Sequence, residues 1–137
     1  MKLHDVVPML YTTELKATVA FYTNTLGFEC RSLNEEWGWA SVSRDEVRVM
    51  FALPNAHLPF EKPAFTGSLY FKTDAADELW QRLKDSVRVC YPIEDFEYGM
   101  REFAIYDNNG YVLQFGQELS ELKSFVNVQP QLGRGLF

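Results

Sequence analysis

Residues 21–28 of this chain read Phe-Tyr-Thr-Asn-Thr-Leu-Gly-Phe, and this stretch decides how the surrounding sequence folds. It ends a predicted helix, because Leu15, Val19, Tyr22 and Leu26 recur on one helical face and Gly27 then supplies a helix stop. Thr12-Thr13 can cap the start of the helix. A strand is predicted before the helix, and three strands after it, over residues 6–11, 28–33, 37–43 and 47–53.

The same order of elements returns in the second half of the chain. Asp74 is a good cap for a second helix, which presents Ala76, Leu79, Trp80 and Leu83 on one face. The turn Asp107-Asn108-Asn109-Gly110 is typical of a hairpin. The four strands predicted around these elements cover residues 68–73, 87–91, 101–106 and 111–115. Val7 and Ser68, 61 positions apart, and Met50 and Gln114, 64 apart, are equivalent in this alignment.

One such unit has a sheet face that it cannot bury alone, so two units are expected to pair. The sequence therefore predicts an α+β fold in which two βαβββ modules form a cupped mixed sheet of eight main strands. We expect a single domain, 1–137, made of module one (5–53), a proline-rich linker (54–63), module two (64–119) and a tail (120–137). Within the tail, Phe125-Val126-Asn127-Val128 could add to a sheet edge.

Bulk properties exclude several functions. The net charge of -6 disfavours nucleic-acid binding, and no apolar stretch approaches the roughly 20 residues that span a bilayer. Cys30 and Cys90 lie in apolar runs without metal-site spacing, so we expect reduced core thiols in a cytoplasmic protein. Aromatic residues make up 15% of the chain, which favours an aromatic pocket or a subunit interface.

Three motifs, taken in order, resemble those of the vicinal oxygen chelate superfamily, which includes glyoxalase, extradiol dioxygenases, fosfomycin-resistance enzymes and bleomycin-resistance proteins. They are residues 21–28, the stretch Tyr98-Gly99-Met100-Arg101-Glu102-Phe103, and residues 107–114. The resemblance implies the glyoxalase/bleomycin-resistance fold, and is greatest to the metal-free bleomycin-resistance type. Because this fold hosts many functions, the resemblance does not identify a ligand.

Metal-dependent members of this superfamily hold a divalent ion with four inward-pointing side chains. By the resemblance, those positions are Val7, Met50, Ser68 and Gln114 here, and we expect all four to face one cavity. Val cannot ligate and Met is too soft for such a site, so the expectation is no metal, no cofactor and no catalytic residue. His4 and His57 are expected to be solvated.

Bleomycin-resistance proteins bind a flat cationic drug between two subunits, and the resemblance implies similar use of aromatic residues here. The expected ligand-binding residues are Trp37, Trp39, Met50, Phe51, Tyr70, Phe96, Tyr98 and Gln114. For Trp39 a core role and a pocket role both remain open. Lys72, predicted on the same face as Tyr70, argues against a strongly cationic ligand unless it turns outward or pairs with an acid.

The predicted function is non-catalytic binding or sequestration of a small aromatic or cationic organic molecule. One alternative is a superfamily enzyme of lyase, dioxygenase or transferase type with a non-standard or absent metal site. Another is an interaction module with a vestigial pocket. We expect a homodimer, with a monomer as the rival, because half-barrels expose sheet edges that are usually covered. A small organic ligand is the expected partner.

Overall fold

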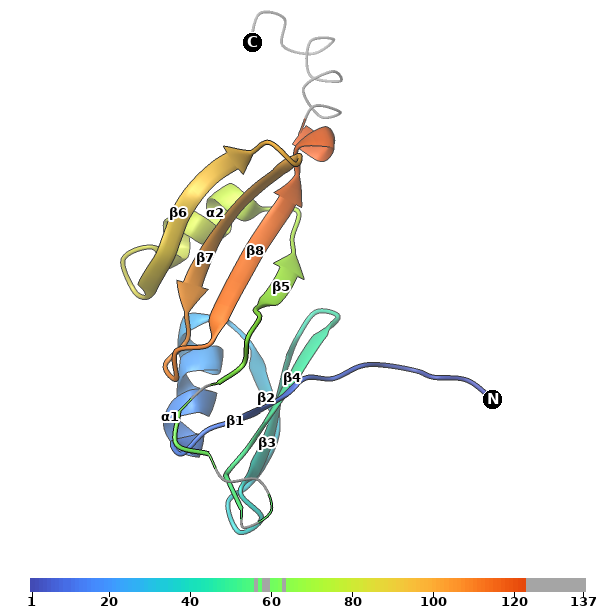
Figure 1. The fold of residues 1–137 in the computed structure, drawn as a ribbon, viewed down its shortest axis with the longest axis vertical. Helices are drawn as coiled ribbons and strands as arrows, with labels where there is room; N and C mark the ends of the chain where they lie inside the picture. Colours follow the sequence, from blue (N-terminus) through green and yellow to red (C-terminus); the bar gives the residue numbers. More distant parts are fainter. Residues whose placement is uncertain (56, 58–59, 63, 123–137) are drawn as a thin grey trace, which may run out of the picture. The chain divides into compact units, whose positions relative to one another are not determined.

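A strand, a helix and three strands follow one another twice along the chain (Figure 1). The structure is a computed structural model that describes residues 1–55, 57, 60–62 and 64–122. The chain divides into two units: unit one holds residues 1–66 with 107–111, and unit two holds residues 67–106 with the chain from 112 onward. The edge-strand role predicted for residues 125–128 concerns a part of the chain outside the described residues.

Unit one contains a four-stranded sheet whose neighbours follow the order β1 (Met9–Tyr11), β4 (Val47–Ala52), β3 (Trp39–Arg44) and β2 (Glu29–Asn34). Strand β1 runs parallel to β4 and pairs Met9 with Met50, and the other neighbours are antiparallel. Alternate residues of the sheet, among them Val42, Val49 and Phe51, are buried together with Tyr22. Between β1 and β2 the chain forms α1 (Leu15–Ala20) and η1 (Phe21–Thr25).

Unit two repeats this arrangement with a sheet in the order β5 (Leu69–Lys72), β8 (Val112–Glu118), β7 (Met100–Tyr106) and β6 (Arg88–Phe96). Strand β5 runs parallel to β8 and pairs Tyr70 with Gln114, the counterparts of Met9 and Met50. Trp80 of the helix packs on Phe103, and Phe103 stacks on Phe115 with ring centroids 5.1 Å apart. The helix of this unit is α2 (Ala76–Leu83), which lies between β5 and β6 in the sequence.

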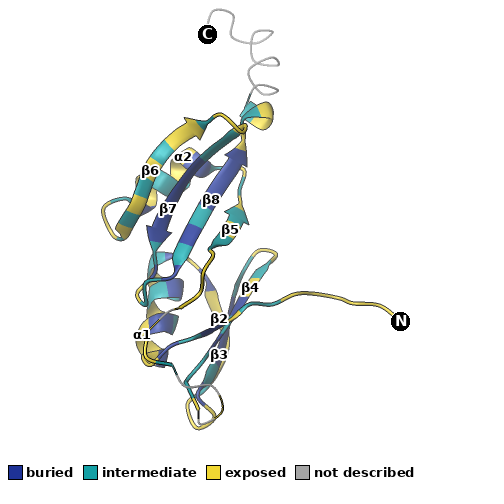
Figure 2. Cartoon of the chain, viewed as in Figure 1, coloured by how far each residue is buried: buried dark blue, intermediate teal, exposed yellow. Residues whose placement is uncertain are grey.

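The predicted fold class is confirmed, because both units are βαβββ modules and each sheet combines one parallel pair with antiparallel pairs. Figure 2 shows that the buried residues of unit two concentrate on its central strands. Strands β7 and β8 are mostly buried, while the edge strand β6 alternates between exposed and partly buried residues. In unit two, alternation along the strands directs Phe103 toward α2 on one face of the sheet. We call the opposite face, which carries the polar side chains of Glu102 and Gln114, the open face.

The helix starts differ from the predicted caps. Thr12 and Thr73, at equivalent places, each accept a hydrogen bond from the backbone N–H two residues on, at 2.9 Å from Glu14 and 3.1 Å from Ala75. Asp74 is not the N-cap of α2. Instead Gln117 of β8 accepts from the Ala76 N–H and donates to the Asp74 carbonyl, so a residue distant in sequence satisfies the helix end.

Two further predictions are corrected. Strand β6 continues to Phe96, past residue 91, and shifts register twice along its pairing with β7. Cys30 and Cys90 are exposed free thiols and not core residues, because both lie on edge strands, β2 and β6, where apolar neighbours do not guarantee burial.

The first helix ends in a π-helical turn, in which the Leu26 N–H donates to the Phe21 carbonyl at 3.2 Å.

The turn between β7 and β8 belongs to unit one. Tyr22 donates from its buried hydroxyl to Asp107 at 2.8 Å, and Tyr111 donates to the Tyr11 carbonyl at 2.7 Å. Asn109 accepts from Thr12 and donates to Thr18. The sequence that resembles a simple hairpin turn is therefore also part of the packing of unit one.

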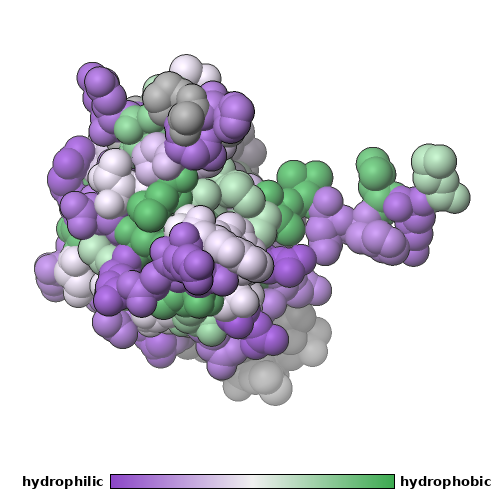
Figure 3. All heavy atoms as spheres, turned by 90° about the horizontal axis from the view of Figure 1, so that it is seen from below, coloured by the Kyte–Doolittle hydropathy of each residue, from purple (hydrophilic) through white to green (hydrophobic). Residues whose placement is uncertain are grey.

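Before β1, the N-terminal residues of unit one extend away from its sheet and carry the exposed side chains Met1, Leu3 and Val6 (Figure 1). Figure 3 shows this arm as alternating hydrophobic and hydrophilic residues, beside a surface on which the two kinds are mixed. The described helices include none with the length and hydropathy of a membrane span.

Candidate functional site

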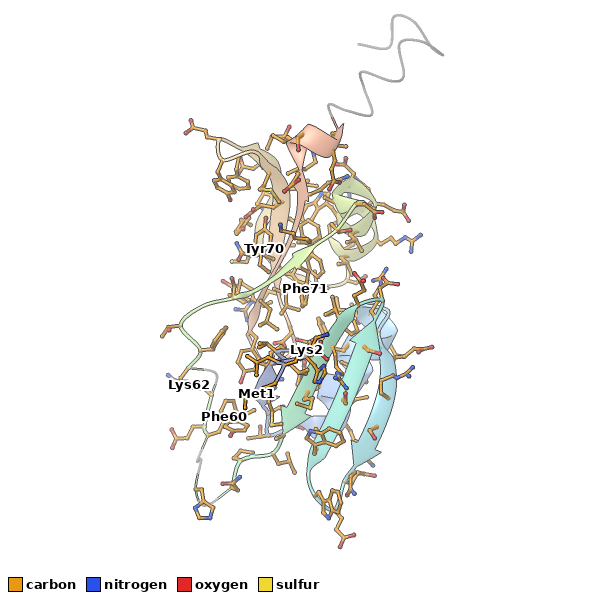
Figure 4. The ribbon with its side chains drawn as sticks, turned by 90° about the vertical axis from the view of Figure 1, so that its right-hand side faces the viewer. Met1, Lys2, Phe60, Lys62, Tyr70 and Phe71 are labelled. Atoms are coloured by element: carbon orange, nitrogen blue, oxygen red, sulfur yellow. The ribbon has the colours of Figure 1, made fainter. Side chains whose placement is uncertain are left out.

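The open face of the sheet in unit two holds a buried carboxylate. Period-two alternation sends Phe103 toward α2 and leaves Glu102 on the opposite face, yet Glu102 is only 1% exposed. On β5, Phe71 packs on Phe115 and Tyr70 reaches Glu102, so consecutive residues serve opposite faces (Figure 4). A charged side chain is rarely buried unless it is hydrogen-bonded, which makes Glu102 the natural centre of a site.

Hydrogen-bond donors surround this carboxylate. Tyr70 donates its hydroxyl to Oε1 of Glu102 at 2.7 Å, Tyr91 donates to Oε2, and the Gln114 amide donates to the same Oε2 at 3.3 Å. Gln114 also donates to the Tyr91 oxygen at 2.7 Å and accepts from the Ser68 hydroxyl. We call Ser68, Tyr70, Tyr91, Glu102 and Gln114 the Glu102 cluster.

A glycine makes room for this arrangement. Gly116 of β8 pairs with Glu102 of β7, and a Cβ added at residue 116 would lie 2.0 Å from the Tyr70 hydroxyl oxygen and 2.7 Å from its Cζ. The Tyr70 ring therefore lies over the bare backbone of residue 116 to reach the carboxylate. Only glycine leaves this space without moving the ring.

The phenols of the cluster stay protonated at neutral pH. Burial raises the pKa of Tyr70, and its hydrogen bond to Glu102 raises it further. Burial also raises the pKa of Tyr91, with Glu102 adding to the shift and the Gln114 hydrogen bond opposing it. Both hydroxyls are thus neutral donors that stabilise one negative charge, and do not contribute charge of their own.

Aromatic rings continue from the cluster toward the end of the sheet. Phe96 stacks on Tyr98 with centroids 5.3 Å apart and an interplanar angle of 10°, and it meets Tyr91 edge-on at 5.7 Å. We call Tyr91, Phe96 and Tyr98 the aromatic wall. Tyr98 is 65% exposed, and desolvation of its hydroxyl together with nearby Glu102 raises its pKa.

A cleft of about 470 Å³ lies beside the aromatic wall. Its described lining includes Phe96 and Tyr98 together with the carboxylates of Glu97 and Glu118, and no basic side chain belongs to that lining. Aromatic faces and carboxylates both attract positive charge. The cleft can therefore bind a cation through a carboxylate, through ring faces, or through both, and Phe96 in its lining meets the ring of Tyr91 from the Glu102 cluster.

The predicted site residues fall into two groups. Tyr70, Phe96, Tyr98 and Gln114 all belong to unit two, where Tyr70 and Gln114 are members of the cluster and Phe96 and Tyr98 form the wall. Tyr91 and Glu102 are the members that sequence reasoning missed. One signal was available for Glu102, since an acid in strand register between Arg101 and Phe103 implies either exposure or a partner.

The remaining predicted residues belong to unit one. Trp37 is 79% exposed in the turn before β3, whereas Trp39 and Met50 are partly buried on β3 and β4. The ligand-binding role predicted for Phe51 is corrected. Phe51 is 0% exposed and its ring centroid lies 4.7 Å from that of Tyr22, so it is a core residue of unit one. It follows Met50 on β4 and so lies on the helix-facing side.

The family positions for a metal do not fit a divalent ion here. Val7 and Met50, in unit one, offer no hard donor. Ser68 and Gln114, in unit two, are hydrogen-bonded to each other, and the Gln114 amide also donates to Tyr91. Both histidines are exposed. That all four family positions face one cavity stays a prediction, because they are divided between the two units.

Another cleft, of about 760 Å³, lies in unit one, and its described lining includes Val7 but none of the predicted ligand-binding residues. Most of the charged side chains that line it already have partners. Arg48 pairs with Asp5 at 3.6 Å, Arg31 pairs with Glu29 at 3.1 Å, and Arg44 donates to the Leu26 carbonyl at 2.7 Å. Such internally paired charges leave little to attract a ligand, so the Glu102 cluster is the better candidate.

Two βαβββ modules, each a helix packed on one face of a four-stranded sheet, define a class of small α+β proteins. This chain belongs to the glyoxalase/bleomycin resistance protein/dioxygenase superfamily, whose family model matches residues 2–115. The search of curated proteins found no match.

Solved structures show the same fold. The bleomycin-binding protein from bleomycin-producing Streptomyces verticillus, complexed with copper(II)-bleomycin, is 25% identical, with a TM-score of 0.65 over 84% of this chain and 96% of that chain. A glyoxalase/bleomycin resistance protein/dioxygenase from Nocardioides is 19% identical, with a TM-score of 0.70 and 87% of both chains covered. TioX from Micromonospora sp. ML1 is 18% identical, with a TM-score of 0.68 over 85% of this chain and 99% of that chain.

Proposed function

We propose that the protein binds and sequesters a small, flat, positively charged organic molecule on the open face of unit two, without changing it chemically. The observation that carries this proposal is the buried carboxylate of Glu102, which lies on the same open face as exposed aromatic rings. A carboxylate supplies charge, and stacked rings supply area for a planar ligand. The Streptomyces verticillus protein, which binds copper(II)-bleomycin, makes a ligand of this kind a reasonable starting point.

The charge of the chain supports the same choice. The net charge is -6, and the cleft beside the aromatic wall adds Glu97 and Glu118 to the negative side. A negative surface raises the local concentration of cations and speeds their association. Lys72 on β5 is exposed, so its ammonium group can extend into solvent.

We further propose that the active form is a homodimer in which a second copy completes the site. The parallel strands β1 and β5 are sheet edges, and edges of this kind are usually covered. Trp37 and Trp39 of one chain would then lie near Tyr98 of the other, with Met50 beside them. The exposed fraction of Trp37, 79%, leaves its ring free for such a role. We place the protein in the cytoplasm, where exposed thiols such as Cys30 and Cys90 stay reduced.

The test is calorimetric titration of the full chain with two probes, bleomycin and 9-aminoacridine, followed by mass spectrometry of the recovered probe. We expect saturable binding of at least one probe, with the probe recovered unchanged. Tyr98→Ala is expected to weaken binding about fivefold, equivalent to the loss of one stacking or cation–π contact. Phe65→Ala, which removes an exposed ring in unit one, is the matched control and should bind as the wild type does.

Failure of both probes to bind would contradict the proposed function. A chemically altered probe would replace sequestration with catalysis. Equal binding by the wild type and Tyr98→Ala would remove the aromatic wall from the site.

A further inference from the structure

The donors around Glu102 differ in how firmly they are held. Tyr91 is partly buried and is hydrogen-bonded to both Glu102 and Gln114. Tyr70 is 40% exposed, and among the described residues its hydroxyl donates to one acceptor, Oε1 of Glu102, at 2.7 Å. It also stands on β5, an edge strand of four residues. Tyr70 is therefore the donor that can leave the carboxylate most easily.

The two oxygens of Glu102 are correspondingly unequal. Oε2 accepts from two internal donors, Tyr91 and Gln114, while Oε1 accepts from Tyr70. The Tyr70 ring lies over Gly116, where no side chain lies beneath it. If the ring rotates outward, it uncovers Oε1 and leaves a slot above the backbone of residue 116.

We propose that Glu102 is the residue that recognises the charge of the ligand, and that Tyr70 is a latch whose hydroxyl is replaced at Oε1 by an N–H group of the ligand. This inference rests on the proposed function and narrows it. The ligand class is a protonated amine or amidinium with at least one N–H donor, and not a quaternary ammonium ion.

The chemistry of the exchange supports this class. The Tyr70 oxygen lies 2.7 Å from Oε1, and a charged N–H donor prefers about 2.7–2.9 Å from a carboxylate oxygen, so a nitrogen fits the place of the phenol oxygen. A buried carboxylate that loses one donor without replacement is destabilised. A quaternary ion has no N–H group, so it cannot replace the hydrogen bond that the Tyr70 hydroxyl donates to Oε1 of Glu102.

The experiment compares two acridine cations of the same ring system and charge, 9-aminoacridine and 10-methylacridinium. Only 9-aminoacridine carries N–H donors when positively charged. Fluorescence titration of the full chain is expected to give about tenfold tighter binding of 9-aminoacridine. Glu102→Gln should abolish that preference.

The latch has its own test. Tyr70→Phe removes the competing hydroxyl and leaves the ring, so 9-aminoacridine is expected to bind about three- to tenfold more tightly, with 10-methylacridinium little changed. Tyr106→Phe is the matched control, because the Tyr106 ring packs against Arg88 at 4.1 Å and its hydroxyl is not among the donors to Glu102. This variant should bind both probes as the wild type does.

The outcomes separate the two proposals. If both acridines bind equally to the wild type, and neither is affected by Glu102→Gln, the inference is wrong while binding itself stands. If neither acridine binds, the proposed function fails for this ligand class and the inference fails with it. Should Glu102→Gln not fold, Tyr70→Phe decides alone: unchanged or weaker binding of 9-aminoacridine overturns the latch.

Discussion

At the scale of single residues, Gly116 controls whether the Glu102 cluster can form. Gly116→Ala would place a Cβ 2.0 Å from the Tyr70 oxygen, so the ring must leave the carboxylate. We expect a loss of about 1–3 kcal/mol in the free energy of unfolding, measured by urea denaturation. In a Tyr70→Ala background the added Cβ has no tyrosine ring to displace, so Gly116→Ala should lower the free energy of unfolding much less. Equal costs in the two backgrounds would show that Tyr70 does not occupy this space.

A second residue-scale prediction concerns Asp107. Burial raises the pKa of Asp107, while its hydrogen bond from Tyr22 lowers it. Because the folded-state pKa lies above the unfolded one, stability from this group is full below about pH 4 and is lost as the pH rises through the folded pKa. Tyr22→Phe removes the hydrogen bond that lowers the pKa of Asp107, so this pKa rises further. The loss of folding stability at neutral pH then becomes larger.

Tyr22→Phe is therefore expected to destabilise by about 2 kcal/mol at pH 7 and by less at pH 4, measured by urea unfolding at both pH values. Tyr111→Phe is the control. It removes a hydrogen bond to the neutral Tyr11 carbonyl, so its cost should not change between the two pH values. A cost for Tyr22→Phe that is the same at both pH values would contradict this account of Asp107.

At the scale of elements, the two modules have unequal helix entrances. Thr12 and Thr73 take equivalent places, but Thr12 is buried and its hydroxyl also forms hydrogen bonds with Thr18 and Asn109. Among the described residues, the Thr73 hydroxyl forms one hydrogen bond, accepted from the Ala75 N–H. We expect Thr12→Ala to cost about 2–3 kcal/mol and Thr73→Ala about 1 kcal/mol, measured by thermal or urea unfolding. Similar costs would mean that the extra bonds of Thr12 contribute little.

The elements also show what the sequence could and could not predict. Tyr70 and Gln114 were predicted on the open face because alternation along β5 and β8 is regular. Strand β6 was predicted too short, because its charged residues Glu94 and Asp95 are typical of a loop and two register shifts interrupt its alternation. Tyr91 lies inside the predicted strand 87–91, but the register shift between Val89 and Tyr91 breaks the alternation that would assign its side chain to a face.

Other site features depend on partners that are distant in sequence. Glu102 is 32 residues from Tyr70, so no local pattern reveals their hydrogen bond. The burial of Gly116 under a tyrosine ring is likewise a property of the folded sheet. The order of the motifs was enough to identify the positions at which the family binds a metal. It could not predict that the Ser68 hydroxyl donates a hydrogen bond to the Gln114 side chain.

At the scale of the whole molecule, the proposed homodimer is the next test. Sedimentation at micromolar concentration is expected to give a species of two chains, each of 15.9 kDa. The expectation rests on the sheet edges at β1 and β5, which isolated modules leave uncovered. A single species of 15.9 kDa would contradict it and would confine the ligand site to one chain.

The turn over residues 107–111 has a consequence for how the protein is made. Tyr22 and Tyr11 receive their partners from residues 85 and 100 positions further along the chain. On the ribosome, the first 66 residues therefore emerge long before the segment that completes their unit. Closing contacts over such separations is slow, and incomplete units expose apolar surface. We expect nascent chains that end before residue 107 to be digested readily by protease, and chains that extend through β8 to resist.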